Sequence, residues 1–194
     1  WAERFVMADA ESDAGVGNAV SRADLINDLA QDEAKIVRIE QSGESGNASQ
    51  ERKLLDWRHR LVQSVWAKRN PAWAERQLVV DVPQLGTIVN GKLDAVFFGG
   101  IDPNDQSKTY TIVDWKTGHR PRKRNEIDEK LAQLDMYRIL LSAMEGVPLD
   151  SIDACLYYLS EPKEGDRELK ALDKTEQEIL AELSYGIPQQ SDND

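Results

Sequence analysis

Asp114 and Lys116 are the residues whose types and spacing most directly suggest chemistry. They follow the run 109–113, Thr-Tyr-Thr-Ile-Val, whose β-branched and aromatic residues favour a strand. Alternate side chains of a strand share one face, so both residues are expected to point the same way, with Trp115 pointing opposite. The sequence therefore predicts a carboxylate and an ammonium group side by side at a strand end.

A second carboxylate is expected beside this pair. Residues 91–98 are typical of another strand, and an antiparallel hairpin would bring Asp94 next to Asp114. Hard divalent cations such as Mg²⁺ bind carboxylate and carbonyl oxygens and keep positions open for water and phosphate oxygen. A neighbouring lysine can orient or deprotonate the attacking water and offset charge in the transition state. Together the residues predict a metal-dependent hydrolytic site.

The elements that must position these residues alternate between helices and strands. The patterns predict helices over 21–39, 51–69, 125–146 and 175–185, and strands over 75–82, 87–98, 109–118 and 152–159. This order predicts an α/β fold. The expected organisation is an acidic helical segment with a flexible linker over 1–50, a core over 51–185 and a disordered tail over 186–194.

Length and charge are compatible with a DNA-binding domain. At 194 residues the chain can form one domain with a substantial core. Its formal net charge of −11 is unusual for a partner of DNA, yet residues 51–125 carry 14 basic and 8 acidic side chains. Polyanion binding depends on local rather than net charge. DNA is therefore not excluded.

Other kinds of site are excluded by the residues present. The single cysteine, Cys155, allows no iron–sulfur cluster and is expected in the core. Residues 86–93 nearly match a phosphate-binding loop, but Leu93 replaces the required hydroxyl and a strand follows, so no nucleotide is expected. No signal peptide or long apolar run is found, which predicts a soluble cytoplasmic protein without membrane contact.

Polar residues that follow the strand of Asp114 could contact a substrate. Four basic side chains come directly after it, at Arg120, Arg122, Lys123 and Arg124. Such a run is often only solvated, but its position favours contact with a phosphate backbone. Gln133 and Tyr137 lie four apart on one helix face. One interpretation is that Tyr137 is a core residue and Gln133 a surface residue. The other is that both lie beside the strand of Asp114, where an amide and a phenol could hydrogen-bond a scissile phosphate or Lys116.

Order and spacing resemble a known family. Glu75 in a strand, Gly91-x-x-Asp94, Asp114-Trp-Lys116-Thr-Gly and Gln133-x-x-x-Tyr137 resemble the RecB-like nucleases of the PD-(D/E)XK group, and more narrowly the C-terminal nuclease domain of AdnA-type helicase-nucleases. The resemblance implies a restriction-endonuclease-like core with a central mixed sheet of about four strands flanked by helices. It implies Mg²⁺ or Mn²⁺ held by Asp94, Asp114 and the Trp115 carbonyl, with catalytic roles for Lys116, Glu75, Gln133 and Tyr137.

The same resemblance implies that the domain belongs to a larger helicase-nuclease complex. The sequence also lacks one motif of that family. Relatives of this kind are bacterial, cytoplasmic DNA-repair proteins in which an ATP-dependent helicase motor and a second subunit deliver single-stranded DNA during double-strand-break processing and recombination. Their Gly-x-x-x-His helix, whose histidine binds metal, is missing, and His59 does not match it. We therefore expect a fragment that begins after that histidine. The alternatives are an inactive nuclease-like module that binds DNA or the partner subunit, and a structural ion pair.

Overall fold

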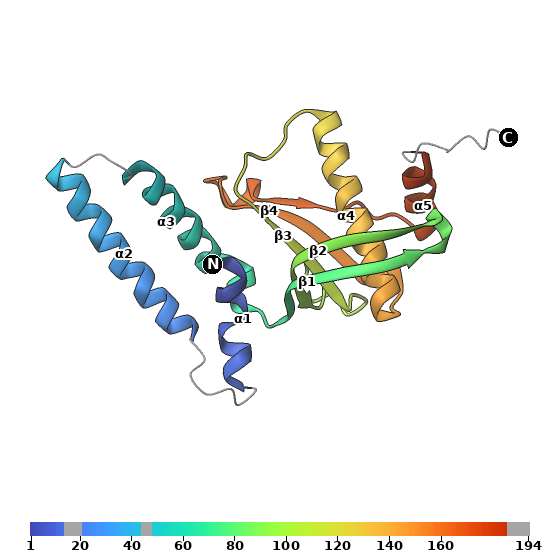
Figure 1. The fold of residues 1–194 in the computed structure, drawn as a ribbon, viewed down its shortest axis with the longest axis horizontal. Coiled ribbons are helices and arrows are strands. Elements are labelled where there is room, and N and C mark those ends of the chain that lie inside the picture. Colours follow the sequence, from blue (N-terminus) through green and yellow to red (C-terminus); the bar gives the residue numbers. More distant parts are fainter. Residues whose placement is uncertain (14–20, 44–47, 186–194) are drawn as a thin grey trace.

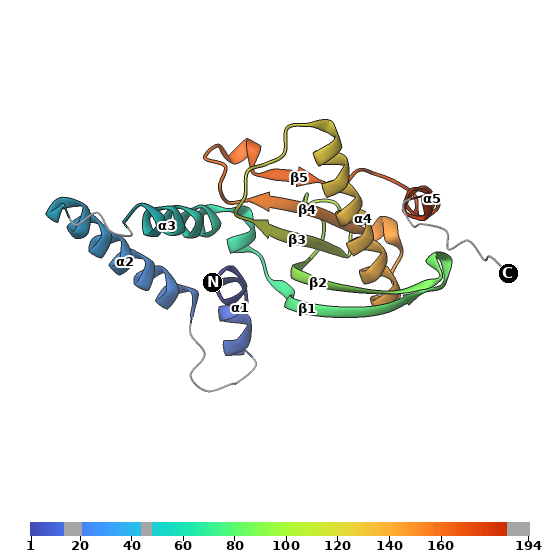
Figure 2. The ribbon, with the colours of Figure 1, turned by 45° about the horizontal axis from the view of Figure 1, so that its top comes forward.

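The computed structural model describes residues 1–13, 21–43 and 48–185 and is built around one mixed five-stranded sheet. The strands lie side by side in chain order (Figure 2). They are β1 (Pro71–Val82), β2 (Thr87–Phe98), β3 (Tyr110–Lys116), β4 (Ile152–Tyr158) and β5 (Glu168–Lys170). The first three strands form antiparallel hairpins, β4 runs parallel to β3, and β5 returns antiparallel to β4.

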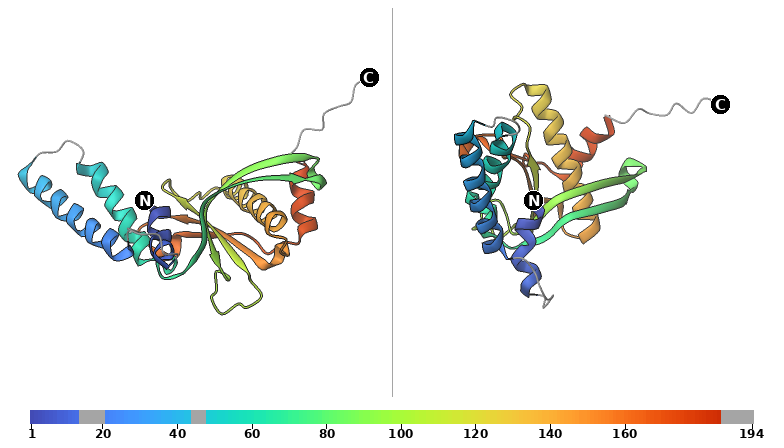
Figure 3. Two further views of the ribbon diagram at one scale, coloured as in Figure 1. Left: turned by 60° about the horizontal axis from the view of Figure 1, so that its bottom comes forward. Right: turned by 60° about the vertical axis from the view of Figure 1, so that its left-hand side comes forward.

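Helices cover both faces of this sheet (Figures 1 and 3). They are α1 (Ala2–Asp13), α2 (Arg22–Ser42), α3 (Ala48–Gln63), α4 (Arg124–Glu145) and α5 (Glu176–Tyr185), with single 3₁₀ turns at Val65–Lys68, Pro83–Leu85, Leu149–Ser151 and Glu164–Asp166. Helix α4 is the crossover that parallel pairing of β3 and β4 requires. With α5 it buries one sheet face, and α1, part of α2 and the end of α3 bury the other.

Alternation along the strands decides which face each side chain enters. In β2, Val96 belongs to the core under α4, whereas Ala95 and Phe97 belong to the core under α1 and α3. In β3, Ile112 and Val113 divide in the same way. In β3 and β4 a residue an even number of positions from Ile112 or Ile152 therefore faces α4. In β2 the alternation is interrupted next to Asp94, because Leu93 also belongs to the core under α4.

The N-terminal helices are fixed to the core. Arg22, at the start of α2, donates hydrogen bonds to the carbonyls of Phe5 and Val6 in α1 and of Ala67 and Arg69. Helix α2 begins at a capping box in which the side chain of Ser21 accepts from the backbone of Asp24 and the Asp24 carboxylate accepts in return. As a result the start of α2 and α1 are held against the residues that lead into β1.

The number of strands and several element boundaries differ from those predicted. The sheet has five strands rather than about four, because the three-residue β5 is too short to leave a sequence pattern. The linker expected over 41–50 is shorter, since α2 reaches Ser42 and α3 begins at Ala48; residues 44–47 lie outside the described part of the chain. The tail over 186–194 also lies outside it. The α/β class and the burial of Cys155 are confirmed.

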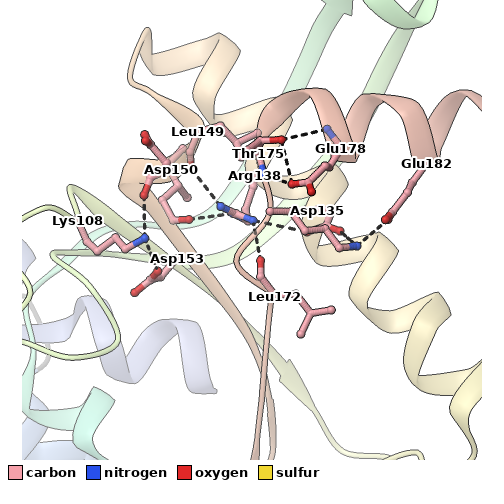
Figure 4. A network of polar contacts seen from close by, with 12 residues as sticks. Lys108, Asp135, Arg138, Leu149, Asp150, Asp153, Leu172, Thr175, Glu178 and Glu182 are labelled. Carbon is pink, nitrogen blue, oxygen red and sulfur yellow. Dashed lines mark hydrogen bonds and ion pairs between the residues drawn. The ribbon is translucent and has the colours of Figure 1, made fainter.

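A buried polar network joins α4 to the ends of β4 and β5 (Figure 4). Arg138 is only 2% exposed, and its guanidinium donates to the backbone carbonyls of Ile152 at 2.8 Å, Leu149 at 3.2 Å and Leu172 at 3.3 Å. It also lies 3.6 Å from Asp135, which binds Lys174 at 3.1 Å. These contacts fix α4 along the sheet and so position its other face.

Within the described residues, every helix is too short or too polar to cross a lipid bilayer.

Candidate active site

The hairpin of β2 and β3 brings the two aspartates together. Ala95 pairs with Val113 in the last step of their antiparallel ladder, so Asp94 and Asp114 stand opposite one another one step further on. Asp114 is two positions from Ile112 and faces α4, whereas Asp94 lies between Leu93 of the core under α4 and Ala95 of the core under α1 and α3. One Oδ2 of Asp94 accepts a 3.0 Å hydrogen bond from the backbone amide of Trp115. The structure therefore brings the two predicted acids next to each other.

Lys116 completes the cluster. Its Nζ lies 2.9 Å from Oδ2 of Asp114, on the same strand and the same face. The Asp114 residue is 5% exposed, while the Lys116 side chain is 27% exposed. The ammonium group thus reaches the buried carboxylate from the solvent side and is not turned into the core, which leaves it accessible to a substrate.

Asp94 is held in an unfavourable charge environment. Its pKa is raised from 3.8 to about 7, first by burial, then by the charge of Asp114 and a hydrogen bond with that side chain. The Trp115 amide acts against this rise, and Glu3 of α1 adds to it. Two carboxylates and a nearby glutamate create a negative site that a cation would neutralise. Glu3 was not singled out from the sequence, because nothing in its local pattern places α1 here.

We expect the substitution Asp94→Asn to stabilise the metal-free protein at alkaline pH. A folded pKa above the unfolded value means that the folded state binds the proton more tightly, so stability is lost as pH rises from about 4 to about 7. Asparagine does not ionise and removes this loss. Because the carboxylate is only partly buried and solvent screens it, we expect a gain in Tm on the order of a few degrees at pH 8.

Thermal unfolding in EDTA from pH 4 to pH 8 tests this expectation. The gain should become small at pH 4, where the aspartate is protonated in the folded state and close to its pKa in the unfolded state. The matched control is Asp81→Asn, which removes an exposed carboxylate on β1. Equal shifts at both pH values, or a loss of stability at pH 8, would contradict the electrostatic account.

The donor atoms suit a hard divalent cation. The Trp115 amide points toward β2, and the amide and carbonyl of one strand residue point to the same side, so its carbonyl also points there. The ladder between β3 and β2 ends at Val113, which leaves that carbonyl beside Asp94. In the described chain no third acid, histidine or cysteine joins the pair. Two carboxylates and one carbonyl match the oxygen ligands of Mg²⁺ or Mn²⁺ with open positions remaining.

Gln133 and Tyr137 of α4 face this cluster. Gln133 Nε2 donates to the Tyr137 hydroxyl at 2.9 Å. Burial raises the Tyr137 pKa, and Asp114 raises it further while Lys116 lowers it, which places the phenol in the field of both residues. Helix α4 comes this close because Gly91 has no side chain: a Cβ there would lie 2.7 Å from Cδ1 of Leu140. The structure therefore brings both predicted helix residues to the site.

Glu75 does not join the acids. By register it stands opposite Asp94, but its φ of 52° breaks the pairing, and its carboxylate binds Lys92 at 2.9 Å on the surface. More than half of the Glu75 side chain is exposed. The expectation of a first-strand glutamate beside the metal is not met in this geometry, because the left-handed backbone turns the side chain outward.

The basic loop lies next to Lys116 but does not enter the acidic cluster. The Arg120 amide donates to the buried Glu161 carboxylate at 3.0 Å, which anchors the loop. Arg122, Lys123 and Arg124 are exposed. Glu161 was missed in the sequence because it follows β4, far along the chain from the loop it holds.

The fold and the site define a nuclease-like class: a restriction-endonuclease-like α/β fold with two acids and a lysine at the ends of paired strands. A family model of the PD-(D/E)XK nuclease superfamily matches residues 4–192, nearly the whole chain. The chain belongs to this superfamily. A comparison with curated proteins gives no match.

Proposed function

We propose that this domain is a metal-dependent deoxyribonuclease that hydrolyses phosphodiester bonds at the cluster of Asp94, Asp114 and Lys116. The observation that carries the proposal is the convergence of two carboxylates with one lysine 2.9 Å from the buried acid. Neighbouring carboxylates repel when no cation is present, and the charge of Asp114 raises the pKa of Asp94 after the larger effect of burial. Such a site is poorly explained as a structural ion pair, which needs one acid only.

The residues around the cluster have distinct roles in this proposal. Asp94, Asp114 and the Trp115 carbonyl would hold Mg²⁺ or Mn²⁺, which supplies Lewis-acid activation of water and neutralises phosphate charge. Lys116 offsets negative charge on the phosphate and orients the attacking water. The hydrogen-bonded pair of Gln133 and Tyr137 positions the phosphate from α4. Arg120, Arg122, Lys123 and Arg124 bind the flanking backbone.

The biological setting belongs to the same proposal. The order of motifs resembles the nuclease domain of AdnA-type helicase-nucleases, in which an ATP-dependent motor and a second subunit accompany the nuclease. We infer that the domain cuts single strands delivered by such a motor during double-strand-break processing and recombinational repair in the bacterial cytoplasm. The support for this setting is the sequence resemblance alone.

Metal dependence and the Asp114→Asn substitution test the proposed activity. Labelled single-stranded DNA should be cut in Mg²⁺ or Mn²⁺ and left intact in EDTA, and Asp114→Asn should lower the rate on the order of a hundredfold or more. Calorimetric titration with Mn²⁺ should show binding that this variant loses. Asp81→Asn serves as the control.

The alternative, an inactive module that binds DNA or a partner subunit, predicts the opposite pattern. Such a module would bind single-stranded DNA equally well in EDTA and Mn²⁺, take up no Mn²⁺ and cut nothing. That result would overturn the enzymatic proposal while leaving the superfamily membership in place.

A further inference from the structure

A hollow of about 510 Å³ lies directly beside the candidate active site. Its wall runs from Lys116 at the end of β3, through the basic loop, to the first turns of α4. Five cationic side chains line it, at Lys116, Arg120, Arg122, Lys123 and Lys130, against two carboxylates, at Glu126 and Glu129. The excess of positive charge suits an anion, and Lys116 belongs to both the hollow and the acidic cluster.

Tyr158 forms the inner wall of this hollow. It pairs with Lys116 in the parallel ladder of β3 and β4, and it faces α4 like Asp114. The residue is 2% exposed, and none of the described residues hydrogen-bonds its hydroxyl. Asp114 raises and Arg120 lowers the Tyr158 pKa after the larger effect of burial, so the phenol lies within reach of both charges. An unpartnered buried hydroxyl is costly and calls for a ligand.

The start of α4 points to the same conclusion. Lys123 is the N-cap, and its side chain caps no amide of the first turn. A helix N-terminus carries partial positive charge, so Lys123 and Arg124 have the wrong sign for this position. Their only described carboxylate partners are long contacts, 3.7 Å from Lys123 to Glu126 and 3.9 Å from Arg124 to Asp128. An anion at the uncapped amides would remove this mismatch.

Two cations of the hollow are available for that anion. Across the described ranges neither Arg122 nor Lys130 forms an ion pair or a side-chain hydrogen bond. Arg120 is different, because its amide binds Glu161 and its guanidinium donates to the Asp166 carbonyl at 3.2 Å. Arg120 therefore shapes the loop in addition to any contact with the DNA backbone, whereas Arg122 and Lys130 have no such structural contact.

We propose that this hollow is a second phosphate site, which holds the phosphodiester next to the scissile one through Tyr158, Lys130, Arg122 and the first amides of α4. The inference rests on the proposed nuclease function and extends it: the substrate must continue past the cut by at least one phosphate on the side of the hollow. The ligand is a phosphodiester of the DNA strand rather than a free phosphate, because Lys116 joins the hollow to the cluster without a break.

Binding measured without cleavage tests the cationic part of the site. Fluorescence anisotropy of labelled oligothymidylate in EDTA should show that Lys130→Ala and Arg122→Ala each weaken binding by about tenfold. Each should also lower the slope of log affinity against log salt by about 0.7. Lys170→Ala, which removes a lysine of β5 outside the hollow, should change neither. Unchanged affinity in both hollow variants would overturn the inference.

Tyr158→Phe tests the hydroxyl itself. Because that hydroxyl has no partner in the described chain, its removal should leave the urea midpoint unchanged or higher while DNA binding weakens several-fold. Tyr157→Phe is the matched control on the opposite sheet face, where the hydroxyl bonds Arg167. A lower midpoint with unchanged DNA binding in Tyr158→Phe would assign the hydroxyl a structural role and overturn its place in the site.

A DNA substrate with one neutral linkage shows whether the hollow binds a phosphodiester of DNA or a free phosphate. Combined with cleavage data, it also tests the second phosphate site independently of the nuclease proposal. A single methylphosphonate placed beside the cleaved bond should weaken wild-type binding on one side only, and Lys130→Ala should abolish that effect. Competition by inorganic phosphate with no methylphosphonate effect would indicate a free-anion site and overturn the inference. If the hollow variants bind DNA normally while Asp114→Asn loses cleavage, the nuclease proposal is supported and the second phosphate site is refuted. If the hollow variants bind DNA weakly while the wild type cuts nothing, the phosphate site is supported and the nuclease proposal is refuted.

Discussion

Replacement of Lys116 by alanine should lower the rate of single-strand cleavage on the order of a hundredfold or more. The ammonium group lies 2.9 Å from the buried Asp114 carboxylate and is 27% exposed, so it can meet a phosphate bound at the acids. A positioned charge of this kind stabilises the transition state more than the bound substrate, and its loss appears in kcat rather than in KM. Single-turnover digestion of labelled DNA in saturating Mn²⁺ measures the effect.

Metal affinity distinguishes this role from that of a structural ion pair. Lys116 is a cation beside the metal position and not a ligand, so Lys116→Ala should bind Mn²⁺ as tightly as the wild type or more tightly. A second variant, Lys116→Gln, keeps a hydrogen-bond donor near Asp114 without the charge and guards against misfolding. Lys35→Ala on α2 is the control for loss of a surface lysine. Wild-type cleavage by both Lys116 variants would refute the catalytic role.

The central part of the site could be predicted because strands have a simple geometry. A period of two fixes Asp114 and Lys116 on one face, and an antiparallel hairpin is enough to place Asp94 beside them. The four-residue spacing of Gln133 and Tyr137 works in the same way on a helix. Local periodicity therefore gave the shared faces, and the family resemblance gave the reason to combine them.

The remainder depends on backbone conformation and on contacts between distant residues. The residue type of Glu75 does not predict its φ of 52°. This backbone angle nevertheless turns its carboxylate away from Asp94. The sequence pattern predicted a helix over 125–146, yet α4 begins at Arg124 with Lys123 as its N-cap. Tyr158 is a strand residue among apolar neighbours, and only the register with Lys116 shows that this residue borders a basic hollow.

Replacement of Arg138 by methionine should cost about 3–5 kcal/mol of folding free energy. The guanidinium is buried and is the donor for three backbone carbonyls at the ends of β4 and β5 (Figure 4). Methionine fills much of the same volume but donates nothing, so these carbonyls lose their partner and Asp135 loses one of its two cations. Urea denaturation of the metal-free protein measures the loss, with Arg124→Met as the exposed control.

A double substitution shows whether charge or packing causes that loss. Removing one member of a buried ion pair is far more damaging than replacing both by apolar side chains. Arg138→Met with Asp135→Leu should therefore regain part of the lost stability, while Lys174 keeps its 2.6 Å contact with Glu182. A loss below about 1 kcal/mol in Arg138→Met would contradict the prediction. Arg138 lies outside the acidic cluster, but it fixes α4 on the sheet. We therefore expect Arg138→Met also to displace Gln133 and Tyr137 and to slow cleavage.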